Sequence, residues 1–149
     1  MPYQEKSAII SVFVGVIIFA LYFYFTWQNF QSGLFEGADA GAQIGRSILW
    51  LIGGGIILNI IAHIGFSIIH AIVTNDQKPS FVVDERDKLI ELLSLRFAYY
   101  IFGAGFLISM IALALNQSFF IVFNIIIFSA FIASLVEGLM QIFLYRRGF

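Results

Sequence analysis

Five polar side chains follow one another at helical spacing within a long apolar stretch. Asn59, His63, Ser67, His70 and Thr74 are separated by four, four, three and four residues, so a helix places them on one face. Polar groups inside a membrane usually face the interior of a helix bundle or a water-filled cavity. The pattern predicts a proton or ion path that opens toward the cytoplasm. The alternative is a set of hydrogen bonds that only holds neighbouring helices together.

Glu137 is the one carboxylate within the last apolar run of the sequence. It lies about 13 Å before the end of that run, at a depth between those of His63 and His70. A charge at the centre of the bilayer costs about 2.5–3.5 kcal/mol, so we expect Glu137 to be protonated or to pair with His63, His70 or Arg96. Gln141, one helical turn later, extends the polar face.

Few residues could bind a metal or attack a substrate. His63 and His70 are seven residues apart, which is about 10 Å along a helix, whereas zinc holds its nitrogen ligands at about 2.0–2.1 Å. One histidine together with Glu137, or a site shared between subunits, is the alternative. The sequence has no cysteine and no Gly-x-Ser-x-Gly or zinc-protease motif. We therefore predict no metal site, no cofactor and no enzymatic activity.

The apolar segments that would position these residues have the composition of membrane-spanning helices. Of the 149 residues, 60% are hydrophobic and only 11% are charged, whereas soluble domains carry about 25% charged residues. A span needs roughly 20 apolar residues. We predict an all-α, four-helix transmembrane bundle in a single domain, residues 1–149, with helices at residues 7–27, 44–74, 84–115 and 119–145.

The predicted helix ends carry residue types that start or stop helices. Residues 75–80 include Pro79, which cannot continue a helix. Asp84 has the residue type of an N-cap and precedes further acidic residues, which suit the positive end of a helix dipole. Residues 116–118 form a tight turn. The first apolar run could instead be a secretory signal, but it is longer than usual and no small-residue cleavage site follows it.

Lysine and arginine are unevenly distributed between the predicted connections, and this bias sets membrane orientation. One side has only Arg46, while the other has Lys6, Lys78, Arg86, Lys88, Arg96, Arg146 and Arg147. The excess predicts that both termini are cytoplasmic, in a multi-pass protein of the inner (plasma) membrane. Aromatic residues agree with the predicted boundaries: they are Trp27 and Trp50 on the outer side, and Tyr99, Tyr100 and Tyr145 on the inner side.

Glycines recur at every fourth position from Gly33 to Gly45. In a helix, this spacing creates a ridge that another helix could approach closely. Charged residues are interspersed among these glycines, so a flexible loop at the membrane boundary is an equal alternative.

A charged segment precedes the third predicted helix and consists of Asp84, Glu85, Arg86 and Asp87. It could be a docking surface or a cytoplasmic gate, or simply a solvated helix end. This motif, followed by Tyr99 and Tyr100, resembles a family of uncharacterised small bacterial membrane proteins. The resemblance covers residues 84–100. It implies a bacterial inner-membrane location and carries no activity or functional residue with it.

Two functions are compatible with these features. The leading hypothesis is a small transporter or channel for protons, ions or a small solute, in which His63, His70 and Glu137 act together with Asn59, Ser67 and Gln141. The alternative is a membrane regulatory or immunity protein that binds another membrane protein through its helices. We expect contact with lipid and a homo-oligomer, because four helices enclose little room. The net charge of −1 argues against nucleic acid as a partner.

Overall fold

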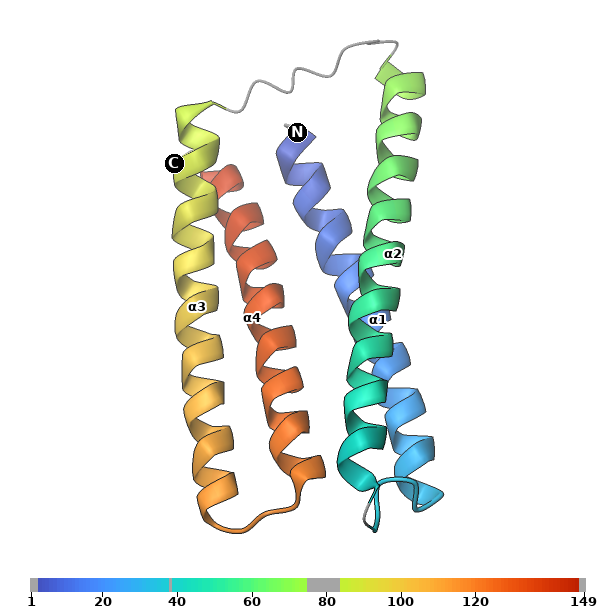
Figure 1. The fold of residues 1–149 in the computed structure, drawn as a ribbon. Coiled ribbons are helices and arrows are strands. Elements are labelled where there is room, and N and C mark those ends of the chain that lie inside the picture. The colour runs from blue at the N-terminus through green and yellow to red at the C-terminus, as the bar shows by residue number, and fades with distance from the viewer. Residues whose placement is uncertain (1–2, 38, 75–83, 148–149) are drawn as a thin grey trace.

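The computed structural model describes residues 3–37, 39–74 and 84–147. They form four long helices that alternate in direction (Figure 1). The helices are α1 (Tyr3–Gln31), α2 (Ala40–Thr74), α3 (Glu85–Ala114) and α4 (Phe119–Arg147). Each is long and apolar enough to cross a membrane. The prediction of an all-α bundle with four candidate membrane spans is therefore confirmed.

The helix ends follow from local sequence. Asp84 is the N-cap of α3: its side chain accepts a hydrogen bond from the backbone N–H of Glu85 at 2.7 Å, and Asp87 completes a capping box. This confirms the predicted start of the helix. At its other end, Asn116 adopts a left-handed conformation with φ 57°, which asparagine tolerates better than most residues. The chain can therefore reverse within a few residues into α4.

The glycine-rich connection between α1 and α2 is a turn rather than a continuous helical ridge. Gly33 and Gly37 have φ values of 74° and 87°, a region that is strained for residues with a side chain. Gly41 and Gly45 belong to α2, where nothing lies within 4 Å of the position of a Cβ. The two halves of the glycine repeat thus serve different purposes.

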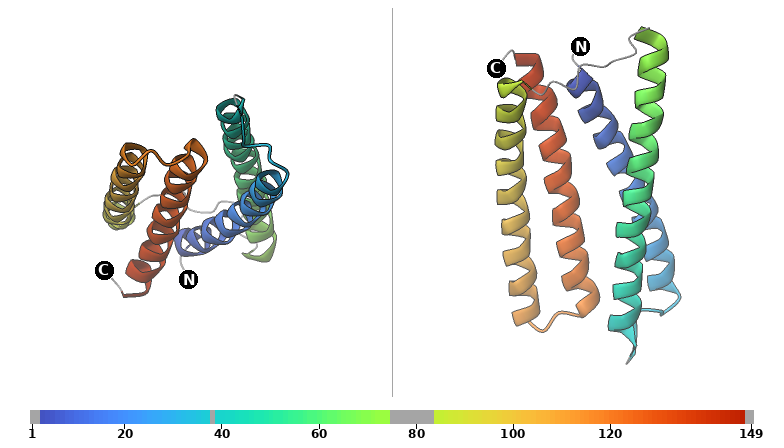
Figure 2. Two further views of the ribbon diagram at one scale, coloured as in Figure 1. Left: turned by 90° about the horizontal axis from the view of Figure 1, so that it is seen from below. Right: turned by 45° about the horizontal axis from the view of Figure 1, so that its top comes forward.

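The helices pack in the spatial order α3, α4, α1, α2 (Figure 2). One end of the bundle holds the starts of α1 and α3 and the ends of α2 and α4. We call it the basic end, because it carries Lys6, Arg86, Lys88, Arg146 and Arg147. The opposite end, with the α1–α2 and α3–α4 connections, is the turn end. Because α3 and α2 are the outer helices of this series, the contact between α4 and α1 joins the α1–α2 pair to the α3–α4 pair.

Two glycines allow the helices to approach closely. A Cβ at Gly105 of α3 would overlap Ser129 of α4, and a Cβ at Gly138 of α4 would overlap Val12 of α1. By contrast, α2 is loosely packed. None of the residues in its most apolar stretch is buried, whereas 17% of the residues are buried in the corresponding stretch of each of the other three helices. Large apolar side chains such as Trp50, which is 82% exposed, therefore face the surroundings, as expected where lipid replaces water.

Candidate functional site: a polar cavity at the basic end

The predicted polar face of α2 packs against the beginning of α1. Ser11 Oγ lies 3.0 Å from His63 Nε2, and the Tyr3 hydroxyl lies 3.0 Å from Ser67 Oγ. The ring of His70 meets the Tyr3 ring edge-on, with 5.2 Å between the ring centroids. The stripe therefore contacts α1 rather than Glu137 on α4.

The α1 partners had a signal that the sequence interpretation overlooked. Tyr3, Ser7 and Ser11 are each four residues apart, so they form a second polar stripe at helical spacing. Tyr3 precedes the predicted helix of residues 7–27, whereas Ser7 and Ser11 lie within it. Because α1 and α2 are antiparallel, the two stripes meet at the basic end.

A cavity of about 220 Å³ opens beside this contact, between α1, α3 and α4. Its polar lining consists of the hydroxyls of Tyr3, Ser7, Ser11 and Tyr145, the amides of Gln4 and Gln141, and the carboxylates of Asp87 and Glu91. No lysine, arginine or histidine of the described helices lines it. Its lining is therefore rich in hydrogen-bonding groups and carries negative charge. We call it the basic-end cavity.

An ion pair lies next to this cavity. Arg146 Nε of α4 donates a hydrogen bond to Oε1 of Glu5 in the first turn of α1, at 3.0 Å. Glu5 is 4% exposed, and a buried carboxylate needs such a partner. The sequence interpretation missed Glu5, because its position in front of an apolar run resembles that of a solvated helix end. Its partner in the last turn of α4 could not be identified without the fold.

Glu137 contacts Gln141 rather than the partners predicted for it. Gln141 Nε2 donates to Glu137 Oε1 at 3.5 Å. Glu137 lines a separate cavity of about 260 Å³ between α3 and α4, with Leu95 and Tyr99 among its neighbours. Arg96 is exposed and forms no ion pair with any residue that the structure describes. The hydrogen-bond partner of Glu137 is thus a neutral amide.

The depth of Glu137 also differs from the expectation. It lies 18 residues beyond the start of α4 at the turn end, about 27 Å along the helix, whereas the hydrocarbon core is about 30 Å thick. Because Gly138 contacts Val12 while Ser11 bonds His63, Glu137 is level with His63. A bilayer placed with one boundary at the turn end therefore has Glu137 at its other boundary.

His63 and Glu137 line neighbouring cavities. Asn59 and His63 border a cavity of about 720 Å³ between α1, α2 and α4. Ala130 and Ser134 of α4 line both this cavity and the one that contains Glu137. The two titratable groups thus line cavities that share part of their wall on α4.

The charged segment at the start of α3, residues 84–87, divides into two parts. Asp84 and Asp87 form the capping box, and Asp87 also lines the basic-end cavity. Glu85 and Arg86 are exposed. Only the second pair is available as a docking surface without disturbing the start of α3.

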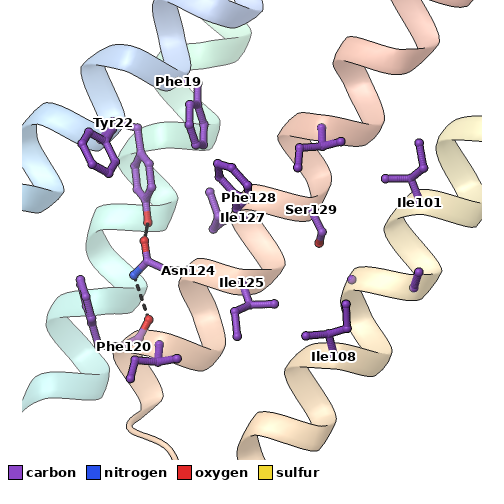
Figure 3. A pocket seen from close by; sticks show the side chains of 15 residues that line it. Phe19, Tyr22, Ile101, Ile108, Phe120, Asn124, Ile125, Ile127, Phe128 and Ser129 are labelled. Carbon is purple, nitrogen blue, oxygen red and sulfur yellow. Dashed lines mark hydrogen bonds between the residues drawn. The ribbon is translucent and has the colours of Figure 1, made fainter.

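A different cavity of about 630 Å³ lies closer to the turn end, between α1, α3 and α4 (Figure 3). Its walls are mostly apolar, but the Tyr22 hydroxyl donates to Asn124 Oδ1 at 3.3 Å and Asn124 Nδ2 donates to the Phe120 carbonyl at 2.8 Å. This polar pair was not predicted. It connects α1 to α4 within the apolar part of the bundle.

The described side chains include no group of three or more His, Asp or Glu placed to hold a metal ion. Comparisons of this chain with protein-family models, with curated proteins and with solved structures found no match. The resemblance of residues 84–100 to small bacterial membrane proteins therefore stays a prediction.

Proposed function

We propose that this protein is a small membrane transporter or channel for protons or a small cation, with the basic-end cavity as its entrance. The observation that supports the proposal is the cavity itself. Side chains from α1, α3 and α4 converge there, and Asp87 and Glu91 are its only charged lining groups among the described residues. Clefts lined by one sign of charge concentrate ions of the opposite sign.

The groups next to the entrance suit proton or cation transfer. Gln141 lines the cavity and also bonds Glu137, so it links the entrance to the one carboxylate deeper in α4. Ser11 lines the same cavity and bonds His63. Histidine and carboxylate side chains are the groups that proton pathways use inside membranes. His63 and Glu137 are therefore the proposed exchanging groups beyond the entrance.

The path is closed toward the turn end by aromatic packing. Phe19 of α1 stacks on Phe131 of α4 with 3.8 Å between ring centroids, and Phe128 lies 5.6 Å from Phe19. Phe19 is eight residues beyond Ser11, about 12 Å deeper along α1. Hydrophobic constrictions of this kind close channels by excluding water. In this proposal, the path is open at the basic end and closed at the aromatic stack.

The proposal is tested by flux into liposomes that contain the purified protein and a trapped pH-sensitive dye. An imposed potential is expected to drive proton uptake that exceeds the rate in protein-free liposomes. Glu91→Gln removes a cavity carboxylate and is expected to lower the rate at least tenfold. Glu85→Gln removes the same charge from an exposed position of the same helix and is the matched control.

Replacement of external sodium by potassium or by tetramethylammonium, at fixed pH, separates proton from cation transport. If none of these ions enters faster than in empty liposomes, the proposal is wrong.

A second candidate function is supported by the loose packing of α2. No residue in its most apolar stretch is buried, and Ile57, Ile61 and Ile69 are each at least 60% exposed. Another membrane protein, or a second copy of the chain, could bind to this exposed side of α2. In this regulatory interpretation, co-purification of a partner would be lost on Ile57→Ala and Ile61→Ala, which shorten exposed side chains of α2. Glu85→Lys, on α3, is the control and is expected to leave the partner bound. Chemical cross-linking in native membranes tests the homo-oligomer.

A further inference from the structure

Arg96 lies on the face of α3 that points away from the rest of the bundle. It precedes Gly105 by nine residues, about two and a half helical turns, so the two residues are on opposite sides of the helix. Gly105 is buried against Ser129 of α4, and α3 is an outer helix that packs along α4 (Figure 2). The exposed Arg96 side chain therefore points toward the surroundings of the bundle, not toward Glu137.

The contact between Gly105 and Ser129 also fixes the depth of Arg96. Arg96 precedes Gly105 by nine residues, and Gly138 follows Ser129 by nine residues. Because α3 and α4 are antiparallel, Arg96 is therefore level with Gly138. From Arg96 to Leu115 at the turn end, the helix rises about 28 Å, close to the roughly 30 Å of a hydrocarbon core. Arg96 thus lies where hydrocarbon gives way to headgroups.

The residues around Arg96 have the character of that boundary but supply no counter-charge. Its neighbours three and four positions away share its side of the helix, and none is acidic: they are Leu92, Leu93, Tyr99 and Tyr100. Tyr99 and Tyr100 are 74% and 64% exposed, as in the aromatic belts of membrane proteins. The ion pair that the described residues form joins Glu5 to Arg146 and does not involve α3. No acidic side chain of the described helices therefore neutralises Arg96.

We propose that Arg96 binds the headgroup phosphate of an anionic phospholipid, with the rings of Tyr99 and Tyr100 against the adjoining glycerol and upper acyl region. A guanidinium presents paired N–H groups that match phosphate oxygens. Its long apolar stem lets the charge reach the headgroup layer from a lipid-facing helix. Anionic lipids are enriched in the cytoplasmic leaflet, the leaflet predicted for this end of the protein. Arg96 itself lines none of the cavities described above, whereas Tyr99 also borders the cavity of Glu137. The lipid site therefore rests on Arg96 and does not depend on the transport proposal.

The test uses the full chain in detergent micelles with added phosphatidylglycerol or phosphatidylcholine, and counts bound lipids by native mass spectrometry. The wild-type protein is expected to retain phosphatidylglycerol preferentially. Arg96→Gln is expected to lower the phosphatidylglycerol-bound fraction at least fivefold. Lys88→Gln, which removes an exposed charge from the same helix, is the matched control and is expected to leave it unchanged. Equal retention by Arg96→Gln and the wild type, or an equal loss in the control, would overturn the proposal.

A second measurement does not depend on the folding of the Arg96→Gln variant. With Trp27→Phe and Trp50→Phe as background, Tyr100→Trp places the single tryptophan one turn from Arg96. In phosphatidylcholine vesicles that contain one-fifth brominated lipid, brominated phosphatidylglycerol is expected to quench this tryptophan at least twice as strongly as brominated phosphatidylcholine. Equal quenching by the two lipids contradicts a headgroup-specific site.

Discussion

Glu5 in the first turn of α1 and Arg146 in the last turn of α4 form an ion pair at 3.0 Å, with the Glu5 side chain buried and the Arg146 side chain 62% exposed. The pair joins the first half of the chain to the second at the basic end. It lies beside the basic-end cavity, since Gln4 and Tyr145, the chain neighbours of the two partners, both line that cavity. The ion pair therefore connects α1 to α4 at the end of the bundle where the cavity opens.

Loss of Arg146 is expected to destabilise the protein. Arg146→Gln leaves the buried Glu5 carboxylate without its charged donor, which costs about 1–3 kcal/mol for a buried unsatisfied group. Arg147→Gln removes the same charge from the next residue, where the guanidinium lies over the Phe143 ring at 5.8 Å, and is expected to cost less than 1 kcal/mol, roughly the value of an exposed cation–π contact. Unfolding by denaturant in detergent micelles measures both. Equal losses would mean that the ion pair contributes nothing specific.

The close approach of α4 to α1 depends on the missing side chain at Gly138. Gly138→Ala introduces a Cβ that overlaps Val12, and overpacking of this kind costs about 1–3 kcal/mol. Gly103→Ala, where no atom lies within 4 Å of the added Cβ, is the control and is expected to leave stability unchanged or slightly higher. Val12→Ala combined with Gly138→Ala is expected to recover much of the loss. A thermal unfolding series in one detergent compares the four proteins, and a double variant no better than Gly138→Ala would argue against this contact.

The hydrogen bond between Tyr22 and Asn124 is expected to contribute modestly to stability. Tyr22→Phe removes the hydroxyl that donates to Asn124 Oδ1, and interhelical hydrogen bonds within membranes contribute about 0.6 kcal/mol on average, with a maximum near 1.7 kcal/mol. Tyr100→Phe removes a hydroxyl from an exposed position and serves as the control. Equilibrium unfolding in mixed micelles resolves such a difference. A loss above 3 kcal/mol would indicate that Tyr22 has a larger role than this one bond.

The aromatic stack is expected to control leakage if the transport proposal holds. Phe131→Ala removes the ring that stacks on Phe19, which widens the constriction and admits water. Proton uptake into liposomes is then expected to rise at least threefold. Phe106→Ala, which truncates an exposed phenylalanine of α3, is the control. An unchanged rate in Phe131→Ala, in protein that still elutes as a single species, would place the barrier elsewhere.

Local features of the sequence were sufficient to predict the helices. The lengths of the apolar runs, Pro79 and the Asp84 cap identify the elements because each acts through neighbouring residues in the chain. The structure begins α1 at Tyr3 and ends it at Gln31, beyond the predicted residues 7–27. Apolar length marks only the part of a helix that lies in lipid, and backbone hydrogen bonds continue past it.

Only the tertiary structure decided which faces of the helices meet. In a soluble helix, a stripe of apolar residues marks the buried side, but here nearly every side chain of the spans is apolar, so no stripe separates a packed face from a lipid-facing one. The contact of Gly138 with Val12 and the pairing of Glu5 with Arg146 join opposite ends of the chain. The sequence therefore determined how many helices form and where their apolar parts lie, although α1, α2 and α4 extend two to four residues beyond the predicted bounds. Close packing and the pairing of distant charges determined that His63 faces Ser11, that Glu137 bonds Gln141 and that Arg96 points outward.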